Sequence, residues 1–182
     1  WAKHENVNHY ATNETSQVTS PVLSEYIGVQ LYLLVGHTDR LQMIPQSVAF
    51  LLCIWLVWRL ALRIGCNTFW ATWVAVLFLS MPVAFAESLT TQNDLITTLC
   101  FLCFLFMAMD LGEEYQDAAL NWRFTGKLLL LGVSAGLAMA AKYYVLLPMG
   151  LVLLWLMYTY IKKRVHPTLI AFSIFVVLGV FL

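Results

Sequence analysis

Two charged side chains beside long apolar runs are the residues best placed to carry chemistry in this sequence. Asp94 ends the polar stretch 87–94 and directly precedes the apolar run 95–109. Lys142 interrupts a second, longer apolar stretch. A charge at membrane depth is costly and usually has a partner or a function. Asp94 is therefore a candidate functional carboxylate, and a lone ammonium at position 142 could bind a phosphate as a point charge.

Both residues also have structural interpretations. An Asp just before a helix caps free backbone N–H groups and suits the helix dipole. Spacing alone supports capping and function equally at Asp94, and the two roles can coexist. Lys142 could instead reach the membrane interface beside Tyr143 and Tyr144, which is the favoured interpretation when it is taken alone. Glu87 is a weaker candidate, because it could be a solvated loop residue.

The opening segment adds further polar residues that could line a site. They are His4, His9, Tyr10, Asn13, Glu25, Asp39 and Arg40. The two histidines are spaced by five, which suits metal ligands on one helix face poorly. The sequence contains no Gly-rich phosphate loop, no Ser/His/Asp arrangement and no haem or zinc motif.

The composition predicts a chain that faces lipid. Of the 182 residues, 61% are hydrophobic and only 11% are charged, and the mean hydropathy is +0.77. Soluble domains carry roughly 25% charged residues, so the excess apolar surface here has to face a membrane. A formal net charge of zero leaves no basic surface for nucleic acid. The Cys100-x-x-Cys103 motif is flanked by Leu and Phe, which indicates thiols inside a membrane helix rather than a metal or redox site.

The apolar runs predict an all-α, polytopic transmembrane helical protein with about six visible spans. The spans are expected at about 41–62, 69–85, 95–109, 128–141 and 143–161, with a sixth that begins near 167. Pro82 falls in the second span, where neighbouring groups can satisfy the freed carbonyl. A long polar loop is expected over 110–127.

Two domains follow from this pattern. Residues 1–40 are expected to form an external, periplasmic or luminal loop, with an amphipathic helix over 21–36 that lies on the membrane surface or, equally, packs on the core. Residues 41–182 form the transmembrane helical domain. The first residues resemble the middle of a loop, and the last run is still apolar where it stops. We therefore expect a fragment that is incomplete at both ends.

The basic residues predict the orientation of the chain. One set of helix ends holds Arg59, Arg63, Arg123, Lys127, Lys162, Lys163 and Arg164, and the other holds only Lys3, Arg40 and Lys142. The positive-inside rule places the larger set in the cytoplasm. The opening segment, the loop that ends at Asp94, and Lys142 then share the extracytoplasmic face.

Five motifs in order along residues 1–160 resemble those of one enzyme family. They are W…H…HYAT in 1–12, PVLSEY in 21–26, GHTDR in 36–40 followed by Gln46, SLTTQND in 88–94, and GLAMAAK in 136–142. With these motifs the chain is similar to the GT-C fold membrane glycosyltransferases of the glycosyltransferase family 39 type. The protein O-mannosyltransferases and the aminoarabinose transferase that acts on lipid A belong to the same group.

The resemblance implies an inverting transfer of a sugar from a polyprenyl-phosphate donor, on the extracytoplasmic side of a bacterial inner or plasma membrane. It implies that Asp94 is the second acidic position of the site, associated with a divalent metal or with the active-site cleft. Lys142 and Arg40 would hold the donor phosphate. The acceptor or loop positions would be His9, Tyr10, Glu25 and Asn93.

The same resemblance implies what the chain lacks. The family's likely general base is an acidic residue that lies shortly before the position matching Trp1, so we expect this fragment not to contain it. Ala11 stands where the family usually has Pro, and the segment 110–127 has no counterpart. The alternative function is a non-catalytic accessory subunit of a larger membrane complex, packed against other membrane proteins. A transporter is a weaker option, since no internal repeat is visible.

Overall fold

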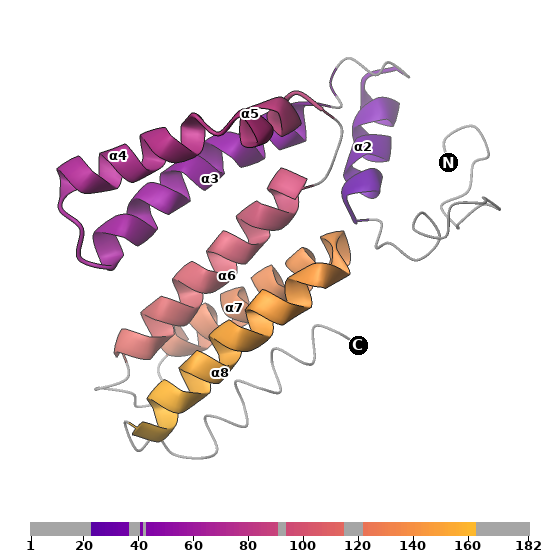
Figure 1. Cartoon of the computed structure of the whole chain (residues 1–182). Coiled ribbons are helices and arrows are strands. Elements are labelled where there is room, and N and C mark those ends of the chain that lie inside the picture. Colours follow the sequence, from indigo (N-terminus) through magenta and orange to yellow (C-terminus); the bar gives the residue numbers. More distant parts are fainter. Residues whose placement is uncertain (1–22, 37–40, 42, 91–93, 115–121, 163–182) are drawn as a thin grey trace.

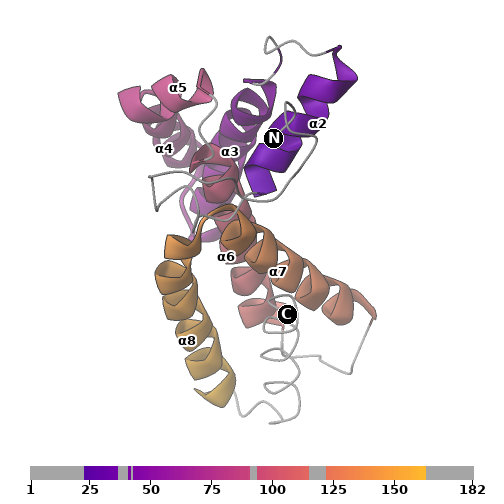
Figure 2. The ribbon, with the colours of Figure 1, turned by 90° about the vertical axis from the view of Figure 1, so that its right-hand side faces the viewer.

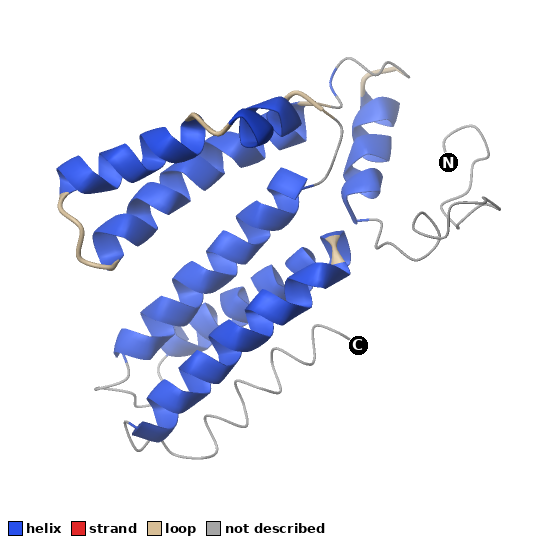
Figure 3. Cartoon of the chain, in the orientation of Figure 1, coloured by secondary structure: helices blue, strands red, loops and turns tan. Residues whose placement is uncertain are grey.

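The computed structural model describes residues 23–36, 41, 43–90, 94–114 and 122–162, and within them every regular element is a helix (Figures 1 and 3). In chain order these are α2 (Leu23–Leu34), α3 (Ile44–Arg63), α4 (Thr68–Leu79), α5 (Pro82–Ser88), α6 (Asp94–Glu114), α7 (Trp122–Ala141), the short 3-10 helix η4 (Tyr143–Val145) and α8 (Leu146–Lys162). The predicted all-α class is confirmed for this part of the chain. The predicted division into two domains is not tested by the structure.

The turn between α3 and α4 shows how local sequence fixes the helix ends. Gly65 has a φ of +102°, a backbone conformation that glycine adopts without strain. Its N–H donates to Leu62 O, and Cys66 N donates to Ala61 O, so the last carbonyls of α3 are satisfied as in a Schellman motif. The side chain of Asn67 then accepts from Trp70 N at 3.0 Å and caps α4.

Pro82 breaks the predicted second span into two helices. Met81 lies in the extended region, with φ −67° and ψ 114°, which is where the residue before a proline is driven. The helices α4 and α5 meet there at a bend of 65°. The span predicted over 69–85 is therefore not one straight helix, and the pair is a broken span or a re-entrant segment.

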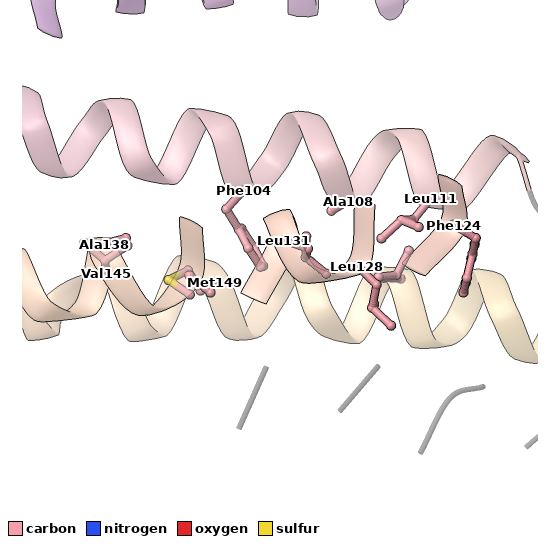
Figure 4. Close-up of a cluster of buried hydrophobic side chains, with 11 residues drawn as sticks. Phe104, Ala108, Leu111, Phe124, Leu128, Leu131, Ala138, Val145 and Met149 are labelled. Carbon is pink, nitrogen blue, oxygen red and sulfur yellow. The ribbon is translucent and has the colours of Figure 1, made fainter. Parts of the chain in front are cut away.

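The helix α6 occupies the middle of the molecule. It contacts α3 on one side and α7 and α8 on the other, so two helix groups share it (Figures 1 and 2). The larger core joins α6, α7 and α8 (Figure 4), with side chains that include Phe104, Leu111, Leu128, Leu131 and Met149. A smaller cluster of Ala49, Phe50 and Leu95 joins α3 to α6. The helix α2 contacts α7 and lies near the end of the bundle where α6 begins.

One face of α7 packs through regularly spaced residues. Leu128, Leu131, Ala135 and Ala138 are buried, whereas Leu129, Leu130, Val133 and Leu137 on other faces are exposed. Small residues let helices approach closely where both lie in lipid. The exposed apolar side chains suit a membrane environment, and similar exposed residues cover α3, α4 and α8.

Three helices in the described part are long and apolar enough to cross a membrane, and the bent α4–α5 pair would make a fourth. These helices, together with the composition, make the chain an integral membrane protein. The six predicted spans are not all confirmed. The fifth corresponds to a shorter apolar helix, Tyr143–Thr159, and the sixth lies outside the described residues. The expected loop over 110–127 was too long, since α6 continues to Glu114 and α7 begins at Trp122.

The predicted amphipathic helix over 21–36 corresponds to α2, Leu23–Leu34. Its predicted position on the membrane surface is not tested by the structure.

Candidate functional site

Asp94 is the first residue of α6, and its side chain points away from its own helix toward the α7–α8 junction. Its Oδ1 accepts hydrogen bonds from Lys142 Nζ and from Tyr144 Oη, the latter at 2.9 Å. None of the described residues donates to Oδ2. The carboxylate still lies where the helix dipole favours a negative charge. Its hydrogen bonds, however, join it to another helix pair rather than capping α6.

Lys142 lies at a break in the chain between α7 and η4. Its backbone is extended, with φ −155° and ψ 126°, so the residue leaves the helix and turns its side chain toward α6. The side chains of Lys142 and Asp94 are 25% and 29% exposed and form an ion pair. The snorkelling interpretation, which sequence alone favoured, therefore misses the principal contact of this lysine. A cation beside the last carbonyls of α7 is also favoured by that helix dipole.

Tyr144 is a member of this cluster that sequence reasoning missed. It was taken only as an interfacial aromatic residue, but its hydroxyl donates to Asp94 and the ammonium of Lys142 lies 5.6 Å from its ring centroid. No local sequence signal points to this hydroxyl, because its position depends on the extended backbone of Lys142 just before the 3-10 helix η4.

Two hydrogen bonds between helices hold the surroundings of the pair. Ser47 Oγ donates to Ser88 O at 2.9 Å, which ties the start of α3 to the end of α5. Cys53 Sγ lies 3.8 Å from Leu95 O, which ties α3 to the residue after Asp94. Glu87, one residue before Ser88, is near enough to interact electrostatically with both Asp94 and Lys142.

A second charged cluster lies at the opposite end of α6. Asp110 pairs with Arg63 through Oδ1 and with Lys127 through Oδ2, the latter at 2.7 Å. Arg63 also lies 5.5 Å from the ring centroid of Phe106. The two cations come from α3 and α7 and the carboxylate from α6, so the cluster links three helices. Two of the cations predicted to be cytoplasmic thus lie at one end of the bundle, and Lys142 lies at the other.

Of the predicted site residues, the structure brings Asp94 and Lys142 together. Four others, His9, Tyr10, Arg40 and Asn93, lie outside the described residues. Glu25 is in α2, but its side chain is not among those described. The roles assigned to all of them stay predictions.

The described residues do not form a metal site around Asp94. No group of three His, Cys, Asp or Glu side chains in this part of the chain could hold an ion. An ammonium already contacts Oδ1 of Asp94, and that charge opposes a cation on the same oxygen. The divalent metal stays a prediction, and no step below passes through one.

Comparison with known proteins gives one match. The family described as dolichyl-phosphate-mannose-protein mannosyltransferase matches residues 19–182. Comparisons with curated proteins and with solved structures found no match. The matched range includes Asp94, Lys142 and Tyr144, and therefore every member of the described cluster.

Proposed function

This chain belongs to the dolichyl-phosphate-mannose-protein mannosyltransferase family, and we propose that it takes part in transferring a sugar from a polyprenyl-phosphate donor to an acceptor hydroxyl. The membrane glycosyltransferase class follows from the family. The donor, the acceptor and the side of the membrane belong to the proposal. The observation that carries it is the Asp94–Lys142 pair at the junction of α6, α7 and η4.

Lys142 is the residue we propose for the donor phosphate. Its ammonium has three N–H donors, and the described structure directs one of them to Asp94. A phosphate oxygen can accept from another without breaking that pair. The side chain is about three-quarters buried, so its charge is screened less by water than that of a surface lysine.

Sugar transfer places extra negative charge on the leaving phosphate as the glycosidic bond breaks. A fixed cation at that point stabilises the transition state. Asp94 keeps the ammonium in place, so it acts mainly by positioning Lys142. The acceptor hydroxyl must lose a proton to a base, and neither member of the ion pair is proposed for that step.

The extracytoplasmic face is proposed for the reaction because of the charge distribution. Arg63 and Lys127 gather around Asp110 at one end of the bundle, and Lys142 lies at the other. The positive-inside rule assigns the first end to the cytoplasm. The donor would then present its phosphate and sugar at the opposite interface, in a bacterial inner or plasma membrane.

Sugar transfer in the full-length protein tests this function. Native membranes containing the Lys142→Ala or Asp94→Asn variant receive polyprenyl-phosphate mannose with a labelled sugar, and the label is followed into the delipidated fraction. We expect each variant to lose about 10- to 1,000-fold in rate, as removing one preorganised charge contact does. Lys127→Ala is the matched control, since it removes a lysine of α7 that also pairs with an aspartate of α6.

Equal loss in Lys127→Ala and Lys142→Ala would show that only the folding of the α6–α7 pair is being measured. Wild-type transfer in both Lys142→Ala and Asp94→Asn would contradict the site assignment. That second result would favour the alternative of an accessory subunit, whose apolar faces pack against other membrane proteins.

A further inference from the structure

Tyr144 contacts both members of the ion pair through different parts of its side chain. Its hydroxyl donates to Asp94 Oδ1 at 2.9 Å, and its ring centroid lies 5.6 Å from Lys142 Nζ. The ring thus lies within range of a cation–π contact while the hydroxyl binds the carboxylate. A residue that only anchored the helix at the interface would need neither contact.

The backbone around Tyr144 is held by the core rather than by burial of the tyrosine itself. The phenol is 55% exposed, but the next residue, Val145, is 4% exposed and Met149 is 1% exposed. Both belong to the core shared by α6, α7 and α8. Val145 N also donates to Lys142 O across the 3-10 turn, at 3.5 Å. The core therefore fixes the backbone that carries the phenol, while Tyr144 itself stays largely exposed.

A bound phosphate would create an electrostatic conflict that this arrangement can relieve. Asp94 and Glu87 already bring negative charge close to Lys142. A phosphate on the same ammonium would add a third anionic group, and like charges at short range disfavour one another. A neutral O–H donor on Asp94 stabilises the carboxylate without competing for the phosphate.

We propose that Tyr144 is a positioning residue for donor binding: its hydroxyl holds Asp94 in place while the ammonium of Lys142 binds the phosphate of the polyprenyl donor. This inference rests on the proposed function. It adds that the site works through three residues, in which the phenol acts on Asp94 and Asp94 acts on Lys142. Tyr144 itself touches neither the sugar nor the phosphate.

The pair Tyr144→Phe and Tyr143→Phe tests the role in the full-length protein. Phenylalanine keeps the ring and removes only the hydroxyl. Tyr143 is the matched control, because it is 64% exposed and its hydroxyl makes no hydrogen bond within the described residues. Steady-state transfer is measured with polyprenyl-phosphate mannose as the probe, and the thermal unfolding midpoint is recorded for each variant.

We expect Tyr144→Phe to raise the KM for the donor about 5- to 10-fold, the size expected for one partly exposed hydrogen bond to a charged group. The kcat should stay within about twofold and the unfolding midpoint should be unchanged, because the ring and its packing remain. Tyr143→Phe should match the wild type in both kinetic parameters.

The result that overturns the inference is a donor KM for Tyr144→Phe equal to that of Tyr143→Phe. A fall in kcat with an unchanged KM would overturn it as well. If either result for Tyr144→Phe is found while Lys142→Ala and Asp94→Asn are inactive, the proposed function stands and only the role of Tyr144 fails. If Lys142→Ala and Asp94→Asn transfer sugar normally, both proposals fail.

Discussion

Oδ1 of Asp94, the first residue of α6, accepts a hydrogen bond from Nζ of Lys142, the residue that follows α7. The same two helices carry a second pair at their other end, where Lys127 Nζ lies 2.7 Å from Asp110 Oδ2. The two carboxylates differ in which of their oxygens have a partner. Asp110 has a cation on each oxygen, whereas both described donors to Asp94 share one oxygen. Cations from two helices therefore hold both oxygens of Asp110, whereas Oδ2 of Asp94 accepts from none of the described residues.

The difference between the two pairs should appear in double-mutant cycles. Each Asp is changed to Asn and each Lys to Met, singly and together, and the free energy of unfolding is measured in detergent. We expect a coupling energy of about 1–2 kcal/mol for Asp110–Lys127 and below about 1 kcal/mol for Asp94–Lys142, because the second pair is more exposed. A larger coupling at Asp94–Lys142 would mean that this pair is chiefly structural.

The first turn of α3 offers a second test, on buried polar groups. Gln46 is 3% exposed, and its Oε1 has no hydrogen-bond partner among the described residues. Gln46→Leu should therefore leave the free energy of unfolding unchanged or raise it by up to about 1 kcal/mol. The neighbouring Ser47→Ala should lower it by about 0.5–1.5 kcal/mol, since the bond to Ser88 O is lost. Thermal unfolding of both variants shows which one is the more stable. A Gln46→Leu protein less stable than the Ser47→Ala protein would contradict the prediction.

The close packing of α6 on α7 can be tested by adding volume. Ala135 is fully buried, whereas Ala140 on the same helix is exposed. Ala135→Leu should lower the free energy of unfolding by about 1–3 kcal/mol, because the inserted side chain has no space. Ala140→Leu should change it by less than about 0.5 kcal/mol. Equal effects at the two positions would show that this face of α7 is not the packed one.

Much of the helical fold could be predicted from sequence because apolar runs and their breaks are local signals. The spans over 41–62 and 128–141 correspond to α3 and to most of α7. The end of α6 was misplaced because Asp110 was taken as the start of a loop. In the structure its charge is neutralised by Arg63 and Lys127 from two other helices, and so the helix can continue.

The part of the site that could be predicted also rested on local signals. Asp94 and Lys142 were identified singly, as charges out of place in apolar sequence. That they contact each other depends on how α6 packs on α7, which residues 48 positions apart do not reveal. The hydroxyl of Tyr144 could not be assigned without the extended backbone of Lys142, which no local motif predicts. Pro82 was noticed, but its 65° bend was not.

Direct binding, measured without an acceptor, tests whether Lys142 binds the phosphate of the donor. Purified full-length protein in lipid nanodiscs is titrated with polyprenyl-phosphate mannose and, separately, with the uncharged polyprenol. Lys142→Gln should weaken the first affinity by about 10- to 100-fold and leave the second unchanged, because only the phosphate contact is removed. Lys127→Gln should alter neither. Equal affinity of the wild type and Lys142→Gln for polyprenyl-phosphate mannose would contradict the claim.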